Sequence, residues 1–118
     1  DELKGATGAG RGYGVAGGVA SAIEECVREY YPDVEVHIEH AESLSECRKM
    51  LMLAKAGKKN GCLIEGMACP GGCVAGAGTN IAIPVAAKAV ASFKEAAPEK
   101  IPDPSMHQNR VEQSEKNF

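Results

Sequence analysis

Two cysteines four residues apart carry the clearest chemical potential of this sequence. They enclose a proline and two glycines in the segment Cys69-Pro70-Gly71-Gly72-Cys73. Proline has no backbone N–H group, and glycine can adopt conformations that let a ligand approach the chain closely. Thiolates ligate iron and zinc, and nearby peptide N–H groups can point at cluster sulfur. The segment therefore predicts a loop that holds a metal or an iron–sulfur cluster, with Cys69 and Cys73 as ligands and Gly71 and Gly72 beside the cofactor.

Two thiolates are fewer than such a site needs, because iron–sulfur clusters and closed zinc sites usually take four ligands. The chain has three more cysteines, Cys26, Cys47 and Cys62. Each lies in an apolar pattern, where a free cysteine is most often a core residue. We favour core packing for these three and keep cluster ligation as the alternative. The missing ligands would otherwise come from a second copy or from another part of the protein. For Cys69 and Cys73 themselves, the alternative is a pair of buried thiols or a local disulfide.

Two histidines and one glycine-rich segment offer weaker chemical signals. His37 and His40 lie three residues apart on or after a polar strand face, which favours solvated side chains over a metal pair. The segment 12–17 matches the G-x-G-x-x-G pattern of dinucleotide-binding proteins. That fingerprint requires a strand immediately before it, and residues 1–11 indicate none. A glycine-rich turn that packs on a neighbour and opens a helix is the simpler interpretation, and a nucleotide-binding module is the alternative.

Composition limits the remaining possibilities. The 118 residues suffice for one domain, and a net charge of −3 argues against nucleic acid or an anionic membrane as partner. No apolar run is long enough to span a bilayer, and the start shows no signal-peptide pattern. Five cysteines cannot complete a disulfide framework. These features predict a cytoplasmic protein in a reducing setting.

Hydrophobic periodicity predicts five elements in the order helix, strand, helix, strand, helix. Apolar residues at helical spacing indicate a first helix over 15–31, and alternation indicates a strand over 34–39. Ser43 and Glu46 form a capping box that opens a second helix over 44–56. A short apolar run over 62–64 indicates a buried strand, and a last helix begins near Pro84 and runs to about residue 97.

This order predicts an α/β fold: a small parallel-sheet lobe with flanking helices, joined by a right-handed crossover helix. The cysteine loop lies at the C-terminal end of a strand, where such sheets bind ligands. Residues 1–13 form a glycine-rich leading segment, 14–97 the lobe, and 98–118 a polar, flexible tail. The apolar residues are mostly small, so we expect a partner lobe or a homodimer to cover the apolar face.

The cysteine motif resembles the last cysteine motif of the iron-only ([FeFe]) hydrogenases. The matching residues run from Ile64 to Val74 and read Ile-Glu-Gly-Met-Ala-Cys-Pro-Gly-Gly-Cys-Val. Residues 14–19 are similar to the glycine-rich helix start of that family, and residues 44–56 resemble the helix before its final motif. The similarity covers most of residues 10–97 and corresponds to the C-terminal part of the catalytic domain of the large subunit.

The resemblance implies a site and a reaction. In that family four cysteines hold a [4Fe–4S] cubane, and one of them bridges to a two-iron subsite that bears CO and cyanide, together the H-cluster. By motif position, Cys69 and Cys73 would ligate the cubane, Cys73 would be the bridging thiolate, and Met67 would lie beside the two-iron subsite. The whole protein would be an oxidoreductase that interconverts protons, electrons and dihydrogen, with a ferredoxin-like electron carrier, in an anaerobic prokaryote.

The other two ligands of that family lie in upstream motifs, Thr-Ser-Cys-Cys-Pro and Met-Pro-Cys-x-x-Lys, which this sequence lacks. We therefore expect the N-terminal remainder of the catalytic domain as a partner, and no cofactor or activity in this chain alone. The family continues Gly-Gly-Gly-Gln-Pro where residues 76–80 read Gly-Ala-Gly-Thr-Asn, which indicates a divergent branch. A non-catalytic cluster-binding or assembly protein, or a hydrogen sensor, is the alternative function.

Overall fold

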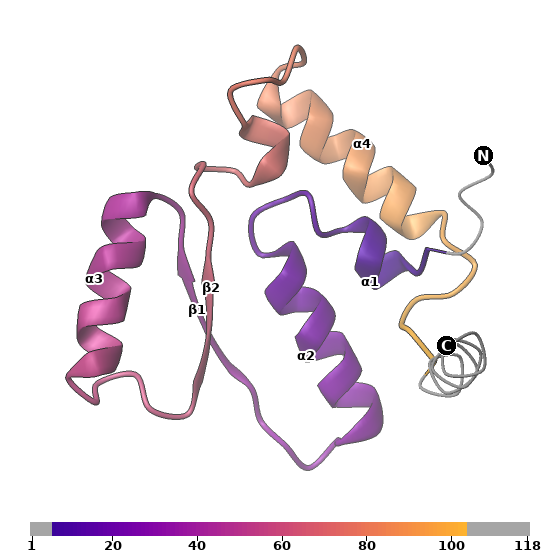
Figure 1. Ribbon diagram of the computed structural model, residues 1–118. Coiled ribbons are helices and arrows are strands. Elements are labelled where there is room, and N and C mark those ends of the chain that lie inside the picture. The colour runs from indigo at the N-terminus through magenta and orange to yellow at the C-terminus, as the bar shows by residue number, and fades with distance from the viewer. Residues whose placement is uncertain (1–5, 104–118) are drawn as a thin grey trace, which may run out of the picture.

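The computed structural model describes residues 6–103 and arranges them as helices around one short sheet. The order is helix, helix, strand, helix, strand, a 3-10 turn and a final helix (Figure 1). The bounds are α1 Gly8–Arg11, α2 Gly18–Tyr30, β1 His37–Ala41, α3 Leu44–Lys55, β2 Cys62–Gly66, η1 Cys73–Ala75 and α4 Ile83–Glu95.

The two strands are parallel, and their register runs from His37 opposite Cys62 to Ala41 opposite Gly66. Helix α3 connects them and lies beside β1, whereas α2 lies on the other flank beside β2 (Figure 1). Helices α1 and α4 pack together beyond α2. This arrangement confirms the predicted α/β fold, and the parallel pairing brings both carboxyl strand ends to the same edge.

The first strand lies further along the chain than its alternating pattern predicts, so the assignment of residues 34–36 to a strand was wrong. The Val34 N–H donates to the Tyr31 carbonyl at 2.9 Å, in the turn that follows α2. Pairing begins only at His37 because β2, the neighbouring strand, begins at Cys62. The alternation of apolar and polar residues therefore begins three residues before the paired part of the strand.

The predicted Ser43 cap at the start of α3 is confirmed, whereas the return bond of the capping box goes to Glu42 instead of Ser43. The Glu46 N–H donates to Ser43 Oγ at 3.2 Å, which satisfies one of the free amides of the first turn. The Glu46 carboxylate reaches back one residue further than expected and accepts from the Glu42 N–H at 2.8 Å. The helix ends at Lys55, one residue before the predicted end.

The other helices also differ from the predicted bounds by a few residues. Helix α2 begins at Gly18 instead of residue 15, because residues 12–17 form consecutive turns. Helix α4 carries Pro84 in its first turn, as predicted, and ends at Glu95. A proline in the first turn is favourable because the missing N–H would have no helical partner there.

The ends of the described chain lie against each other. Residues 8–11 form the short helix α1 where a loop was expected, with a Gly10 N–H to Thr7 Oγ1 bond of 3.2 Å at its start. Residues 99 and 100 accept backbone hydrogen bonds from residues 8 and 9 at 2.7 and 2.8 Å. Residues 99–100 of the expected tail are thus hydrogen-bonded to the fold, and residues 104–118 and 1–5 lie outside the described part.

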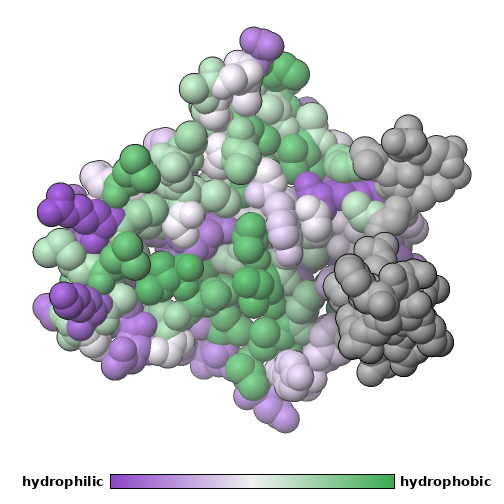
Figure 2. Space-filling model, in the orientation of Figure 1, coloured by the Kyte–Doolittle hydropathy of each residue, from purple (hydrophilic) through white to green (hydrophobic). Residues whose placement is uncertain are grey.

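Small side chains make up the core. Within residues 6–103, the buried apolar residues are five alanines: Ala9, Ala20, Ala22, Ala41 and Ala97. Larger apolar side chains remain exposed, among them Leu44 at 74% and Leu51 at 66% on α3. Figure 2 shows apolar residues gathered across the middle of the face it presents, over the sheet and the helices beside it. The helices therefore approach closely, and much apolar surface of this chain is open to contact.

Among the helices of residues 6–103, none has the length and apolar character that a membrane span requires.

Candidate metal centre

Cys69 and Cys73 lie directly beyond the carboxyl end of β2. Cys69 is half-buried, and Cys73 is exposed and begins η1. Both thiols are free, so the structure shows no disulfide between them. The position is the one at which parallel α/β sheets bind ligands. We call residues 67–74 the cysteine loop.

The two glycines between the cysteines hold the loop in a shape that other residues would resist. Gly71 and Gly72 have φ values of 93° and 88°. A methyl group at Gly72 would stand 2.5 Å from the Ala16 nitrogen, because the loop presses against that segment. The Gly72 N–H donates to the Cys69 carbonyl at 2.9 Å and closes the turn. Backbone close approach, with no side chain in between, therefore defines this part of the site.

Residues 12–17, which we call the glycine turn, hold the cysteine loop from one side. The Ala16 N–H donates to the Gly71 carbonyl at 3.1 Å, and the Val74 N–H donates to the Gly14 carbonyl at 3.0 Å. In the described chain helix α1 precedes this turn and no strand does. The turn therefore lacks the strand that a dinucleotide-binding fingerprint needs, and packs on a neighbour and opens a helix instead.

Glu65 in β2 fastens the glycine turn to the sheet. Its carboxylate accepts hydrogen bonds from the N–H groups of Gly17 at 2.6 Å, Val19 at 3.1 Å and Ala20 at 3.1 Å. His40 Nδ1 lies 3.1 Å from the same carboxylate, whose side chain is 8% exposed. Burial alone would raise the pKa of Glu65, but the hydrogen bonds from Ala20, His40, Gly17 and Val19 outweigh it and lower the pKa. A negative charge also suits the N-terminus of α2.

The contact with Glu65 changes the interpretation of the histidines. His37 is exposed, as expected for a solvated side chain, whereas His40 pairs with Glu65. Sequence reasoning missed Glu65 as a helix cap because its partners lie 45 to 48 residues away. One signal was available: Glu65 is the one charged residue within the otherwise apolar strand Cys62–Gly66.

A second carboxylate contacts the cysteine loop directly. Glu42 follows the last residue of β1, and its Oε2 accepts a hydrogen bond from the Gly71 N–H at 2.9 Å. This bond joins the chain after β1 to the loop after β2. Sequence reasoning missed it because the two residues are separated by 29 positions.

Met67 and Cys47 also lie at this edge of the sheet. The Met67 N–H donates to the Ala41 carbonyl at 2.8 Å, which extends the pairing of β1 and β2 by one step. The Cys47 thiol lies 3.7 Å from the Ala41 carbonyl and 3.8 Å from the Met67 carbonyl. Cys62, by contrast, begins β2 at the opposite end, and Cys26 faces a groove beside α1. All three cysteines are half-buried.

The donor set fits half of a four-thiolate site. Within residues 6–103, no three or more His, Cys, Asp or Glu side chains gather as a complete metal site requires. The loop nevertheless offers two free thiols, one of them exposed, on a glycine-shaped backbone. These residues suit a cluster whose other ligands come from outside this chain.

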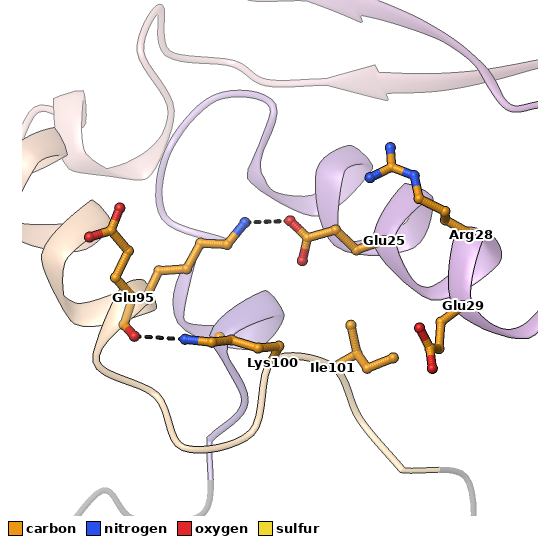
Figure 3. Close-up of a pocket in the computed structure, with 8 residues that line it drawn as sticks. Glu25, Arg28, Glu29, Glu95, Lys100 and Ile101 are labelled. Carbon is orange, nitrogen blue, oxygen red and sulfur yellow. Dashed lines mark hydrogen bonds and ion pairs between the residues drawn. The ribbon is translucent and has the colours of Figure 1, made fainter.

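A separate cleft of about 470 Å³ lies between α2, α4 and the segment after α4. Charged side chains of these elements line it; Figure 3 shows Glu25 directed across it and Lys100 directed toward the Glu95 backbone. Lys94 Nζ pairs with Glu25 Oε1 at 2.7 Å, and Lys100 Nζ donates to the Glu95 carbonyl at 2.7 Å. We call it the charged cleft. Its lysines bind groups of the protein itself, so it joins the helices instead of offering a ligand site.

Comparison with known proteins identifies a family for most of the chain. A family model described as "Iron only hydrogenase large subunit, C-terminal domain" matches residues 1–77. The match covers well over half of the chain and includes the glycine turn, both strands and the cysteine loop. No curated protein matches the chain.

Proposed function

Because this chain belongs to the family of C-terminal domains from iron-only hydrogenase large subunits, we propose that Cys69 and Cys73 supply two of the four cysteine ligands of a [4Fe–4S] cluster. The observation that carries the proposal is the glycine-shaped cysteine loop, with two free thiols at the carboxyl end of a parallel sheet. Cys73 would also bridge to a two-iron group, and Met67 would lie beside it.

The chemistry of the bound groups is the interconversion of protons, electrons and dihydrogen, which makes the whole protein an oxidoreductase. The residues of this chain would position the two cysteine ligands and shield the bound groups from water. The glycine turn and Glu65 hold the cysteine loop from one side, and Glu42 holds it at Gly71. Fixed ligand geometry of this kind is what a protein contributes to a cofactor that carries the reactive centre.

The two missing thiolates define the partner. They would come from the N-terminal remainder of the catalytic domain, which would lie against the carboxyl edge of the sheet. The exposed Cys73 and the apolar surface left open by the alanine core support such a neighbour. A ferredoxin-like carrier would exchange electrons with the assembled cluster.

The test uses the complete protein that contains this chain, produced without oxygen and supplied with iron, sulfide and the two-iron group. We expect Cys69→Ser and Cys73→Ser each to lose most of the bound iron and the electron paramagnetic resonance signal of the reduced cubane. Cys62→Ser is the matched control, because Cys62 lies at the other end of β2, and it should retain both.

Infrared bands of CO and cyanide separate the candidate roles. Their presence in the wild-type protein, and their loss in Cys73→Ser, supports the hydrogenase site. A cubane without these bands would indicate a cluster-binding or assembly protein. Unchanged iron content in the Cys69→Ser, Cys73→Ser double variant would contradict the proposal.

A further inference from the structure

We propose that Glu42 positions the backbone between Cys69 and Cys73, and that its negative charge lowers the reduction potential of the cluster bound through these two cysteines. The inference rests on the proposed function, because it concerns the same two ligands. It assigns a role to a side chain that lies outside the cysteine motif.

The geometry places a carboxylate at the middle of the cysteine loop. Glu42 extends from the carboxyl end of β1, and its Oε2 accepts the Gly71 N–H at 2.9 Å. Gly71 lies two residues from each cysteine, so the carboxylate stands against the segment that joins the two ligands. Glu42 is itself held, because its N–H donates to Glu46 Oε2 at 2.8 Å at the start of α3.

Two physical effects of this contact act in the same direction. Reduction adds an electron to the cluster, and a fixed negative charge nearby destabilises the reduced state by electrostatic repulsion. Peptide N–H groups that donate to cluster sulfur stabilise the reduced state. The Gly71 N–H already donates to Glu42, so it is not free to donate to sulfur. Both effects lower the potential.

Glu65 does not compete for this role. Its carboxylate receives three backbone N–H groups at the N-terminus of α2, and these donors offset its charge. Glu42 accepts one N–H from the loop and is exposed. Its influence should therefore weaken as salt is added, because exposed charges are screened over about 10 Å at 0.1 M salt.

The test is a reductive titration of the complete protein with dithionite, followed by electron paramagnetic resonance after iron content has been measured. Glu42→Gln keeps the shape and the acceptor oxygen but removes the charge, and we expect a more positive midpoint potential. Glu42→Asp keeps the charge and should stay closer to wild type. The difference between wild type and Glu42→Gln should shrink at high salt.

Glu35→Gln is the matched control, because Glu35 is an exposed glutamate before the amino end of β1, away from the loop. It should leave the potential unchanged. If Glu42→Gln binds no cluster, Glu42→Ala takes its place in the titration, with the same positive shift expected.

Three results would overturn the inference. They are an unshifted potential in the cluster-bearing Glu42 variant, an equal shift in Glu35→Gln, and a shift that salt does not reduce. Failure of the proposed function is recognised separately and earlier, as wild-type protein whose iron content equals that of the Cys69→Ser, Cys73→Ser double variant.

Discussion

The cysteine loop and the charged cleft are held together in opposite ways. At the loop, backbone atoms of the glycine turn contact the backbone of residues 71–74. The Glu65 carboxylate, on a side chain that is 8% exposed, joins that turn to β2. In the cleft, long side chains cross the space between helices, and the Lys94–Glu25 pair is about one third exposed on each side. Backbone contacts fix position, whereas long exposed side chains adjust to small displacements. The position of the cysteine loop is therefore fixed more rigidly than that of the side chains in the charged cleft.

The largest effect is expected from one methyl group added to the cysteine loop. In Gly72→Ala the new methyl meets the backbone of Ala16, and the positive φ is strained as well. We expect the free energy of unfolding to fall by about 3 kcal/mol or more, because the backbone strain and the overpacking act together. Amide hydrogen exchange of the loop in the complete protein, together with iron content, measures the effect.

Gly61→Ala is the matched control for that substitution. Gly61 also has a positive φ, of 78°, but a methyl there meets nothing within 4 Å. Its cost should be limited to backbone strain of about 1–2 kcal/mol. Equal effects of the two substitutions would show that conformation, and not close approach, is what the loop requires.

Glu65→Gln should have the next largest effect. An amide can no longer present two acceptor oxygens to the first turn of α2, and the favourable charge at the helix N-terminus is lost. We expect the free energy of local opening at this turn to fall by about 2 kcal/mol, which would speed amide exchange of Val19 and Ala20 about 30-fold. Unchanged exchange would mean that the turn is held by its backbone contacts alone.

The same carboxylate makes the turn sensitive to acid. The pKa of Glu65 is lowered below its ordinary value of 4.5. Its stabilisation is therefore fully present above pH 4.5 and is lost as the pH falls through the lower pKa of the folded protein. Exchange of Val19 and Ala20, corrected for intrinsic rates, should accelerate in that window, and Glu65→Gln should remove the dependence. Acceleration beginning above about pH 5 would contradict this assignment.

The smallest effect is expected in the charged cleft. Lys94→Met removes the partly exposed pair with Glu25 but keeps the apolar stem. Such pairs contribute about 0–1 kcal/mol, and less at high salt. A fall of more than about 2 kcal/mol in the free energy of unfolding, measured by amide exchange in α4, would mean that the cleft contributes as much to stability as the contacts of the loop.

Local signals in the sequence predicted both strands and the helices α2, α3 and α4 to within a few residues, but they predicted neither the short helix α1 nor the long-range contacts. Ser43 lies three residues before Glu46, so its role as the cap of α3 could be predicted directly and is confirmed. The beginning of a paired strand depends on where its parallel partner begins, which is why residues 34–36 were assigned wrongly. The position of the cysteine loop followed from strand order. Its attachment through Glu65 and Glu42 did not, because these partners meet only after the chain has folded.

The alanine core has a calorimetric consequence. Alanine buries little apolar area, so unfolding of this region exposes little new apolar surface to water. The heat-capacity change and the dependence of stability on denaturant both scale with that surface. A small heat-capacity change and a shallow denaturant dependence are the expected signatures of this lobe by itself. Covering Leu44, Leu51 and the other open apolar side chains with a neighbouring domain would increase both.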